Sequence, residues 1–306
     1  MTKPTRAQMK SRGRALIICM SPSRRGGMDK LDIGLCYLSH AQTELPRDEE
    51  TTLSNNRIKP SHIAPIVAQL LMLLCPPPAW ADESPAATPY RPTVSNPAEL
   101  SAPGWLEMEA GLARTKGGDS AWQNDTPWLL KLAFTEDFGL LLGGDARVRQ
   151  VDISGTAQSG FGDTSLTLKH HWALDESSAL GLEWGVKIAT AEANIGSGKQ
   201  DYGVNGIYSR DIGNVRLDAN IGATRLGLRE VGLAQWQYPW AVAISRPISD
   251  DWSVAFEVSG ISRRGAIPPT QLLLAASYSV TKRLVLDCGV ISGISETAPK
   301  WSAFMG

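Results

Sequence analysis

The chain contains few of the residues from which disulfide frameworks and metal centres are built. It has four cysteines and four histidines among 306 residues, and Cys288 is the only cysteine after residue 81. A single thiol forms no intramolecular disulfide and no metal cluster. His170 and His171 are the only histidines in that part of the chain. Adjacent side chains on a strand point to opposite faces, so these two do not share one metal ion. The sequence therefore predicts neither a metal site nor a cofactor.

Catalytic and nucleic-acid-binding patterns are also missing. Two adjacent histidines give no indication of a Ser-His-Asp triad. The chain contains no P-loop, HExxH, CxxC or dinucleotide-binding fingerprint. Its formal net charge of −1 leaves no basic excess for nucleic acid. We therefore expect no catalytic residues and no nucleic-acid partner.

Long apolar runs are absent as well. The longest, residues 63–75, is shorter than the ~20 residues that a membrane-spanning helix needs. It follows Arg57 and Lys59 and precedes Ala79-Trp80-Ala81, which together give the basic, apolar and cleavage-site regions of a secretory signal peptide. The prolines at 76–78 disfavour the alternative of a buried soluble helix, because they end any helix. We predict a signal peptide at residues 57–81.

The segments on either side of this signal lack periodicity. Residues 1–56 are mostly polar, and we interpret them as a spurious upstream extension from a misplaced translation start or, alternatively, as a genuine disordered extension. Residues 82–103 are rich in Pro, Ser and Ala and are predicted to be an exported linker. The remaining residues, 104–306, are predicted to form one domain.

That domain is dominated by residues that alternate between apolar and polar. The stretch from Gly160 to Thr190 contains two such runs joined by Asp175–Ser178, and Val215–Ala223 shows the cleanest pattern. Side chains on a strand alternate with a period of two, so each run predicts a strand with one apolar face. About twelve strands are predicted, at Trp105–Ala113, Pro127–Phe134, Phe138–Val151, Ser165–Trp172, Leu180–Ile188, Asp201–Tyr208, Val215–Ala223, Gln235–Ser245, Trp252–Gly260, Gln271–Val280, Leu284–Ser292 and Lys300–Gly306.

The connections between these strands alternate strictly in length. Short turns such as Thr135–Asp137 and Ser249–Asp251 are followed by longer, Gly- and Ser-rich links such as Asp152–Asp163 and Arg225–Ala234. A soluble sandwich has no reason to sort its loops in this way, whereas an up-and-down outer-membrane barrel has short periplasmic turns and longer external loops. The sequence thus predicts an all-β fold, a single antiparallel transmembrane β-barrel of about twelve strands.

Charged residues fall on the strand face opposite the apolar one, which in a barrel points into the lumen. There they must pair or be hydrated, and they favour either a selectivity region for a polar solute or a salt-bridge network that fills a narrow barrel. The predicted lumen-lining residues are Glu107, Glu109, Lys131, Asp145, Arg147, Arg149, Lys169, Glu183, Lys187, Arg216, Asp218, Glu257 and Asp287.

A resemblance to a known family rests on four features. These are Gly160-x-Gly162-Asp163-Thr164 leading into a strand, a short turn with the strand that ends at Thr190, the linker ahead of Gly104, and the closing Pro299-x-Trp301. Over roughly residues 90–306 the chain resembles bacterial outer-membrane barrel proteins labelled as transporters of the phenol meta-degradation pathway. The resemblance implies an outer-membrane location and passage of small, often hydrophobic compounds. It supplies no catalytic residues.

Three functions are weighed on this basis. The first is a channel or transporter for small, hydrophobic or aromatic molecules in the outer membrane of a Gram-negative bacterium. The second is a closed structural or surface-interaction barrel, and the third, an outer-membrane enzyme, is disfavoured by the missing catalytic groups. The expected partners are outer-membrane lipid, an unidentified small solute and the barrel-assembly machinery. Because the last strand stops at Gly306, we expect either a truncated chain or an imperfectly closed seam.

Overall fold

The computed structural model describes residues 85–306 apart from 118–121, 153 and 194. The predicted upstream extension (1–56) and signal peptide (57–81) lie outside the described residues. No helix that is long and apolar enough to cross a membrane occurs in the part of the chain that the structure describes.

Strands in one antiparallel sheet make up the described chain. In chain order they are β1 (Leu106–Ala110), β2 (Leu112–Lys116), β3 (Trp122–Ala133), β4 (Phe138–Val151), β5 (Ala157–Gly160), β6 (Thr164–Asp175), β7 (Ser178–Ile188), β8 (Asp201–Ile212), β9 (Val215–Arg225), β10 (Trp236–Pro247), β11 (Trp252–Arg263), β12 (Thr270–Thr281), β13 (Leu284–Gly293) and β14 (Trp301–Met305).

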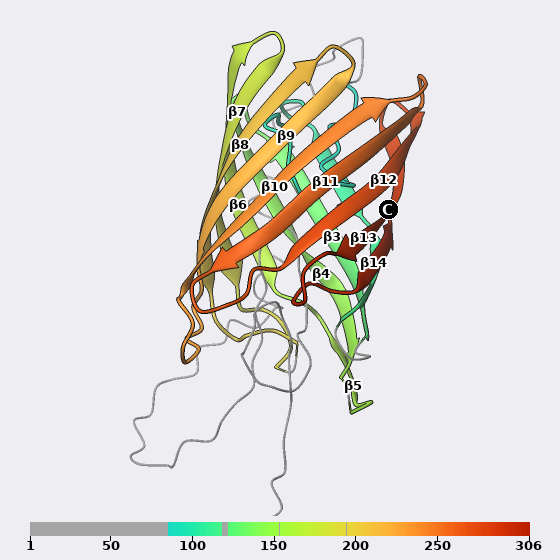
Figure 1. Ribbon diagram of the computed structural model, residues 1–306. Helices are drawn as coiled ribbons and strands as arrows, with labels where there is room; N and C mark the ends of the chain where they lie inside the picture. The colour runs from blue at the N-terminus through green and yellow to red at the C-terminus, as the bar shows by residue number, and fades with distance from the viewer. Residues whose placement is uncertain (1–84, 118–121, 153, 194) are drawn as a thin grey trace, which may run out of the picture.

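These elements build a closed barrel of twelve strands (Figure 1). β1 and β2 both pair with β3 and form one strand that is interrupted at Gly111. β5 pairs only with the end of β4, at residues 148–151, which pair with β3 on their other side. Each remaining strand pairs with its neighbour in the sheet order, and β3 pairs with β4. The prediction of an all-β, up-and-down antiparallel barrel is confirmed.

The seam is closed by the last strand. β14 pairs with β13 from Trp301 to Met305, and the same five residues pair with β2 on the other side. Gly306 continues this contact, because its N–H and C=O both bond to the backbone of Asp287. The expectation of an imperfect seam is therefore wrong: five residues suffice to hydrogen-bond both edges.

The two rims differ in their connections, as the sequence predicts. Short turns join β3 to β4, β6 to β7, β8 to β9, β10 to β11 and β12 to β13, and all of them lie at the upper rim in Figure 1. Gly213 in the β8–β9 turn has a φ of 63°, a left-handed conformation that glycine adopts without strain. The longer connections and β5 lie at the lower rim. By the usual arrangement of outer-membrane barrels, the short-turn rim is periplasmic and the long-loop rim external.

Burial in this barrel is the reverse of that in a soluble protein. Lys131, Lys169 and Lys187 are among its largest fully buried side chains, whereas large apolar side chains such as Ile221 and Leu274 are 71% and 59% exposed. A soluble fold almost never buries lysine in this way. The outward apolar band is the surface that a barrel presents to lipid.

A charge on this outward band is expected to destabilise the barrel according to its depth. Ile221 lies near the middle of β9 and points outward, so Ile221→Arg should lower the free energy of unfolding by about 2–4 kcal/mol. Ile212 is exposed beside a turn at the short-turn rim, and the matched Ile212→Arg should cost about 0–1 kcal/mol. Denaturant unfolding in phospholipid vesicles measures both values. Equal small costs would show that the band does not face hydrocarbon.

Candidate functional site

The lumen is occupied by the segment that precedes the first strand. Residues 85–103, here called the plug segment, run inside the barrel and appear in blue-green in Figure 1. Tyr90, Ser95 and Ala98 are 3%, 0% and 0% exposed. The described part of the predicted linker 82–103 is therefore not a linker but a lumen-filling element.

The plug segment is bound chiefly through its own backbone. Wall side chains accept hydrogen bonds from its N–H groups, so a chain without regular structure has its donors satisfied inside the barrel. The donors, with their acceptors, are Thr88 to Glu107, Tyr90 and Arg91 to Glu109, Val94 and Ser95 to Glu257, Asn96 to Asn220, and Ala98 to Ser209.

The first anchor lies where β1 pairs with β3. Lys131 Nζ lies 2.9 Å from Glu107 Oε2 and 2.5 Å from Glu109 Oε1, and it also donates to the carbonyl of Thr88. Glu109 accepts the N–H of Tyr90 at 2.8 Å. One buried lysine thus bridges two carboxylates that bind the plug segment.

A second buried lysine fixes the middle of the plug segment. Lys169 Nζ donates to Tyr90 Oη at 2.9 Å and to the carbonyl of Pro97 at 2.5 Å, and it lies 3.4 Å from Glu183 Oε1. Tyr90 Oη in turn donates to the carbonyl of Glu99. Burial raises the pKa of the Tyr90 phenol well above its ordinary value, and nearby carboxylates, Glu183 first among them, raise this pKa further. The phenol therefore remains a neutral donor and acceptor.

The far wall holds the plug segment through carboxylate and amide groups. Glu257 Oε2 accepts the N–H groups of Val94 and Ser95 at 2.8 and 2.7 Å. Asn220 accepts the N–H of Asn96 at 3.0 Å and donates to its carbonyl at 2.9 Å. The plug segment is thus bonded to opposite sides of the barrel.

Two arginine pairs add to this anchoring. Arg91 donates to both carboxylate oxygens of Asp287 at 2.9 and 2.8 Å, a bidentate geometry. Arg216 pairs with Glu99 of the plug segment and with Asp218 on its own strand at 3.1 Å. The ion pairs therefore reach both ends of the plug segment.

A separate buried cluster lies at the long-loop rim. Lys187 Nζ is 3.2 Å from Asp163 Oδ2 and 2.9 Å from Asp201 Oδ2, and all three side chains are at most 3% exposed. Asp163 accepts the N–H of Ala191, and Asp201 accepts the N–H of Gly227. These bonds tie two external loops to the barrel wall, a structural role.

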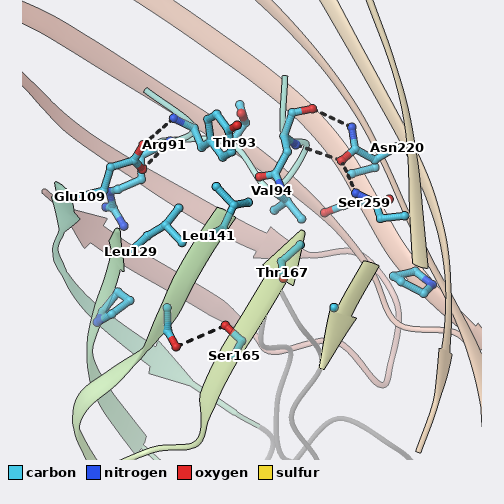
Figure 2. A pocket seen from close by; sticks show the side chains of 18 of the residues that line it. Arg91, Thr93, Val94, Glu109, Leu129, Leu141, Ser165, Thr167, Asn220 and Ser259 are labelled. Carbon is cyan, nitrogen blue, oxygen red and sulfur yellow. Dashed lines mark hydrogen bonds between the residues drawn. The ribbon is translucent and has the colours of Figure 1, made fainter. Parts of the chain in front are cut away.

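Between the plug segment and the wall lies a cavity of about 360 Å³. In Figure 2, Leu129, Leu141 and Thr167 lie on the wall below Thr93 and Val94 of the plug segment. The apolar side chains that line the cavity include Val94, Ala113, Trp128, Leu129, Leu141, Val204, Ala241, Ile261, Leu273 and Phe304. The polar side chains that line it include Asn96, Asp145, Ser165, Thr167, Asn205 and Thr224. A volume of this size holds a small organic molecule.

The predicted lumen-lining residues fall into four groups. Those that contact the plug segment are Glu107, Glu109, Lys131, Lys169, Glu183, Arg216, Asp218, Glu257 and Asp287. Asp145 lines the cavity. Lys187 belongs to the cluster at the long-loop rim. Arg147 and Arg149 form the fourth group.

The placement of Arg147 and Arg149 in the lumen is corrected by the structure. β4 carries one extra residue opposite Thr126 of β3, because Asp145 pairs with Pro127 while Val148 pairs with Asp125. This bulge shifts the alternation by one residue. Both arginines are exposed, and Arg149 pairs with Asn124 on the outward face.

His170 and His171 point to opposite faces, as their adjacency predicts. The His170 ring stacks on Phe138 with centroids 4.0 Å apart, whereas His171 occupies the inner face opposite Gly181. No group of three or more His, Cys, Asp or Glu side chains suited to a metal ion occurs among the described residues. Neither histidine has an arrangement that indicates catalysis.

Solved outer-membrane barrels share this fold. The COG4313 outer membrane channel from Pseudomonas putida F1 aligns with a TM-score of 0.56 at 14% identity, over 68% of this chain and 96% of that one. The NanC porin aligns with a TM-score of 0.50 at 11% identity, over 64% and 97%. No family model and no curated protein matches the chain. Both likenesses concern the fold, and they agree with the closed antiparallel β-barrel described above.

Proposed function

We propose that this protein is an outer-membrane channel that admits small, largely apolar molecules into the cavity between the plug segment and the barrel wall. The cavity carries this proposal. Its volume of about 360 Å³ and its lining of leucine, valine, alanine and aromatic side chains suit a small apolar or aromatic solute. Asn96, Asn205 and Thr167 add polar groups that orient such a solute. The resemblance to barrel proteins of the phenol meta-degradation pathway favours the same class.

Binding of an apolar probe tests the proposal. A naphthylamine dye whose fluorescence rises in apolar surroundings is titrated into the folded protein in nanodiscs, and the signal of empty nanodiscs is subtracted. Phenol and toluene then compete for the site, with glucose as the polar comparison. We expect competition by the aromatic compounds and none by glucose. Equal competition by glucose, or a dye that finds no saturable site, would refute an apolar solute.

Filling the cavity should abolish this binding. Thr167 is 6% exposed and lines the cavity wall, so Thr167→Trp would occupy much of the space and weaken probe binding at least ten-fold. The matched variant Ala173→Trp places the same side chain in β6 at an exposed position near the short turn, and it should bind the probe as wild type does. Probe affinity measured by fluorescence titration compares the two. Equal affinities in all three proteins would place the probe elsewhere.

A closed barrel without transport is the second candidate. The observation that favours it is the number of bonds that hold the plug segment across the lumen, from Glu107 on one side to Glu257 on the other. Single-channel recording in planar bilayers separates the two functions. A channel shows small but resolved conductance steps, and a closed barrel shows none. Conductance together with probe binding supports the channel.

A further inference from the structure

The outward face of the barrel carries a cluster of basic residues at the long-loop rim. Arg114 of β2, Asn124 of β3 and Arg149 of β4 form one row of the sheet, and Lys116 follows Arg114 on the same face. Arg147 is exposed in the adjacent bulge of β4. We call Arg114, Lys116, Arg147 and Arg149 the basic rim patch. Because strands lie about 4.8 Å apart, Arg114 and Arg149 are separated by roughly 10 Å across the sheet.

The residues of the basic rim patch point outward, as the orientation of their neighbours shows. Thr115, between Arg114 and Lys116, is bonded to Ser302, and both line the inner cavity. The side chains on either side of Thr115 therefore point outward. Arg149 also points outward because of the bulge in β4. Regular alternation would have turned it inward. Re-aiming a side chain is a common consequence of a β-bulge.

Two tryptophans place the basic rim patch at the level of lipid headgroups. The guanidinium of Arg114 and the ammonium of Lys116 lie 4.5 and 5.1 Å from the Trp122 ring centroid. The Trp301 ring meets Trp122 edge-on, with centroids 5.4 Å apart. Tryptophan on the outside of a barrel concentrates where hydrocarbon gives way to headgroups. The cations stacked on Trp122 therefore lie in the same zone.

The charges of the basic rim patch are not neutralised as those of the lumen are. Among the described residues, the ion pairs involve Arg91, Lys131, Lys169, Lys187, Arg216 and Arg263, and none involves a member of the patch. Aligned basic side chains in a headgroup zone attract anionic lipid, and arginine is especially suited to phosphate.

We propose that the basic rim patch binds the phosphate groups of lipopolysaccharide in the outer leaflet. The inference rests on the outer-membrane location and on the long-loop rim facing outward. Under those conditions the lipid beside the patch is phosphorylated lipid A, whose acyl chains lie against the apolar band while its phosphates meet Arg114, Lys116 and Arg149. The site then fixes one lipid against β2, β3 and β4.

Binding of lipid A to the purified, folded barrel tests this proposal. Bis-phosphorylated lipid A, dephosphorylated lipid A and inorganic phosphate are titrated in mixed micelles against wild type and the triple variant Arg114→Gln, Lys116→Gln, Arg149→Gln. One basic residue near an anionic surface contributes about five-fold in affinity, so the triple variant should bind bis-phosphorylated lipid A on the order of 100-fold more weakly. Dephosphorylated lipid A should bind weakly to both proteins.

The matched control neutralises three exposed cations at or near the short-turn rim, Arg210→Gln, Lys282→Gln and Arg283→Gln, and should bind as wild type does. Heat-modifiable migration on a gel confirms that each variant is folded. Equal binding by wild type and the rim variant, equal loss in the control, or full competition by inorganic phosphate would each overturn the proposal. Conductance in bilayers of phospholipid alone is recorded in parallel. Absence of conductance in the wild-type protein would count against the channel function and not against the lipid site.

Discussion

Deleting Thr88 to Ala98 is expected to raise the single-channel conductance several-fold. These residues cross the lumen and account for most of the wall contacts of the plug segment, including those to Glu109 and Glu257. Twelve strands enclose a lumen wider than that of a side-chain-filled eight-stranded barrel, so removal of the plug segment leaves a continuous aqueous path. Planar-bilayer recording of the deletion variant and wild type, in the same salt solution, measures the change.

The deletion needs a control that shortens the chain without touching the lumen. Removing residues 155–160 takes away β5, which pairs only with the end of β4 at the long-loop rim, and should leave the conductance close to that of wild type. Both variants must show the heat-modifiable migration of a folded barrel. Equal conductance in the plug deletion and wild type would mean that the permeation path does not pass the plug segment.

Replacing Lys131 with methionine is expected to release the plug segment. The variant leaves Glu107 and Glu109, whose side chains are 15% and 12% exposed, without their shared counter-charge, and removal of one partner from a buried ion pair costs about 3–5 kcal/mol. The element with the fewest stabilising contacts opens before the rest of the protein unfolds. The lost free energy should therefore favour opening of the plug segment rather than unfolding of the barrel. We expect the open state to become at least 100-fold more populated.

Reaction of a buried cysteine with a maleimide reports this opening. Ser95 is 0% exposed in the plug segment, and Ser95→Cys in a Cys288→Ser background gives one thiol among the residues that the structure describes. The protein is expressed from residue 82, because Cys19, Cys36 and Cys75 lie upstream of it. Lys131→Met should accelerate labelling at least 100-fold, whereas Lys282→Met, which removes an exposed lysine, should not. Adding Glu107→Gln and Glu109→Gln to Lys131→Met should restore slow labelling in part. Unchanged labelling with Lys131→Met would show that this ion pair does not hold the plug segment.

The barrel could be predicted from the sequence because lipid imposes a strict pattern on its strands. In β4 the predicted and observed bounds coincide at Phe138–Val151, and β9 begins at Val215 as its alternation indicates. Both strands need an apolar outer face over their full membrane-spanning length. The start of β3, from Trp122 to Thr126, lies outside the strand predicted at Pro127–Phe134, because Gln123, Asn124 and Asp125 show no alternation.

The plug segment could not be predicted because much of its binding passes through its backbone. Its N–H groups bond to wall carboxylates, and any residue other than proline supplies such a donor. The inward-facing lysines Lys131 and Lys169 indicate that the lumen contains partner groups for them. The sequence does not show that residues 85–103 supply some of these partners. The prediction that Arg149 points into the lumen is wrong for a different reason. A single bulged residue in β4 reverses the facing of every residue after it.

The central claim is that lipid lies outside a single cylinder whose polar interior holds the plug segment. β12 tests it most directly, because Leu272, Leu273 and Leu274 are identical residues that face alternate sides: Leu274 is 59% exposed, and Leu273 is 1% exposed beside the cavity. Single spin labels at these positions, in the Cys288→Ser protein expressed from residue 82 and placed in vesicles, are exposed to oxygen dissolved in the bilayer. We predict high oxygen collision rates at 272 and 274 and a low rate at 273. Equal rates at all three positions, or the highest rate at 273, would contradict the account.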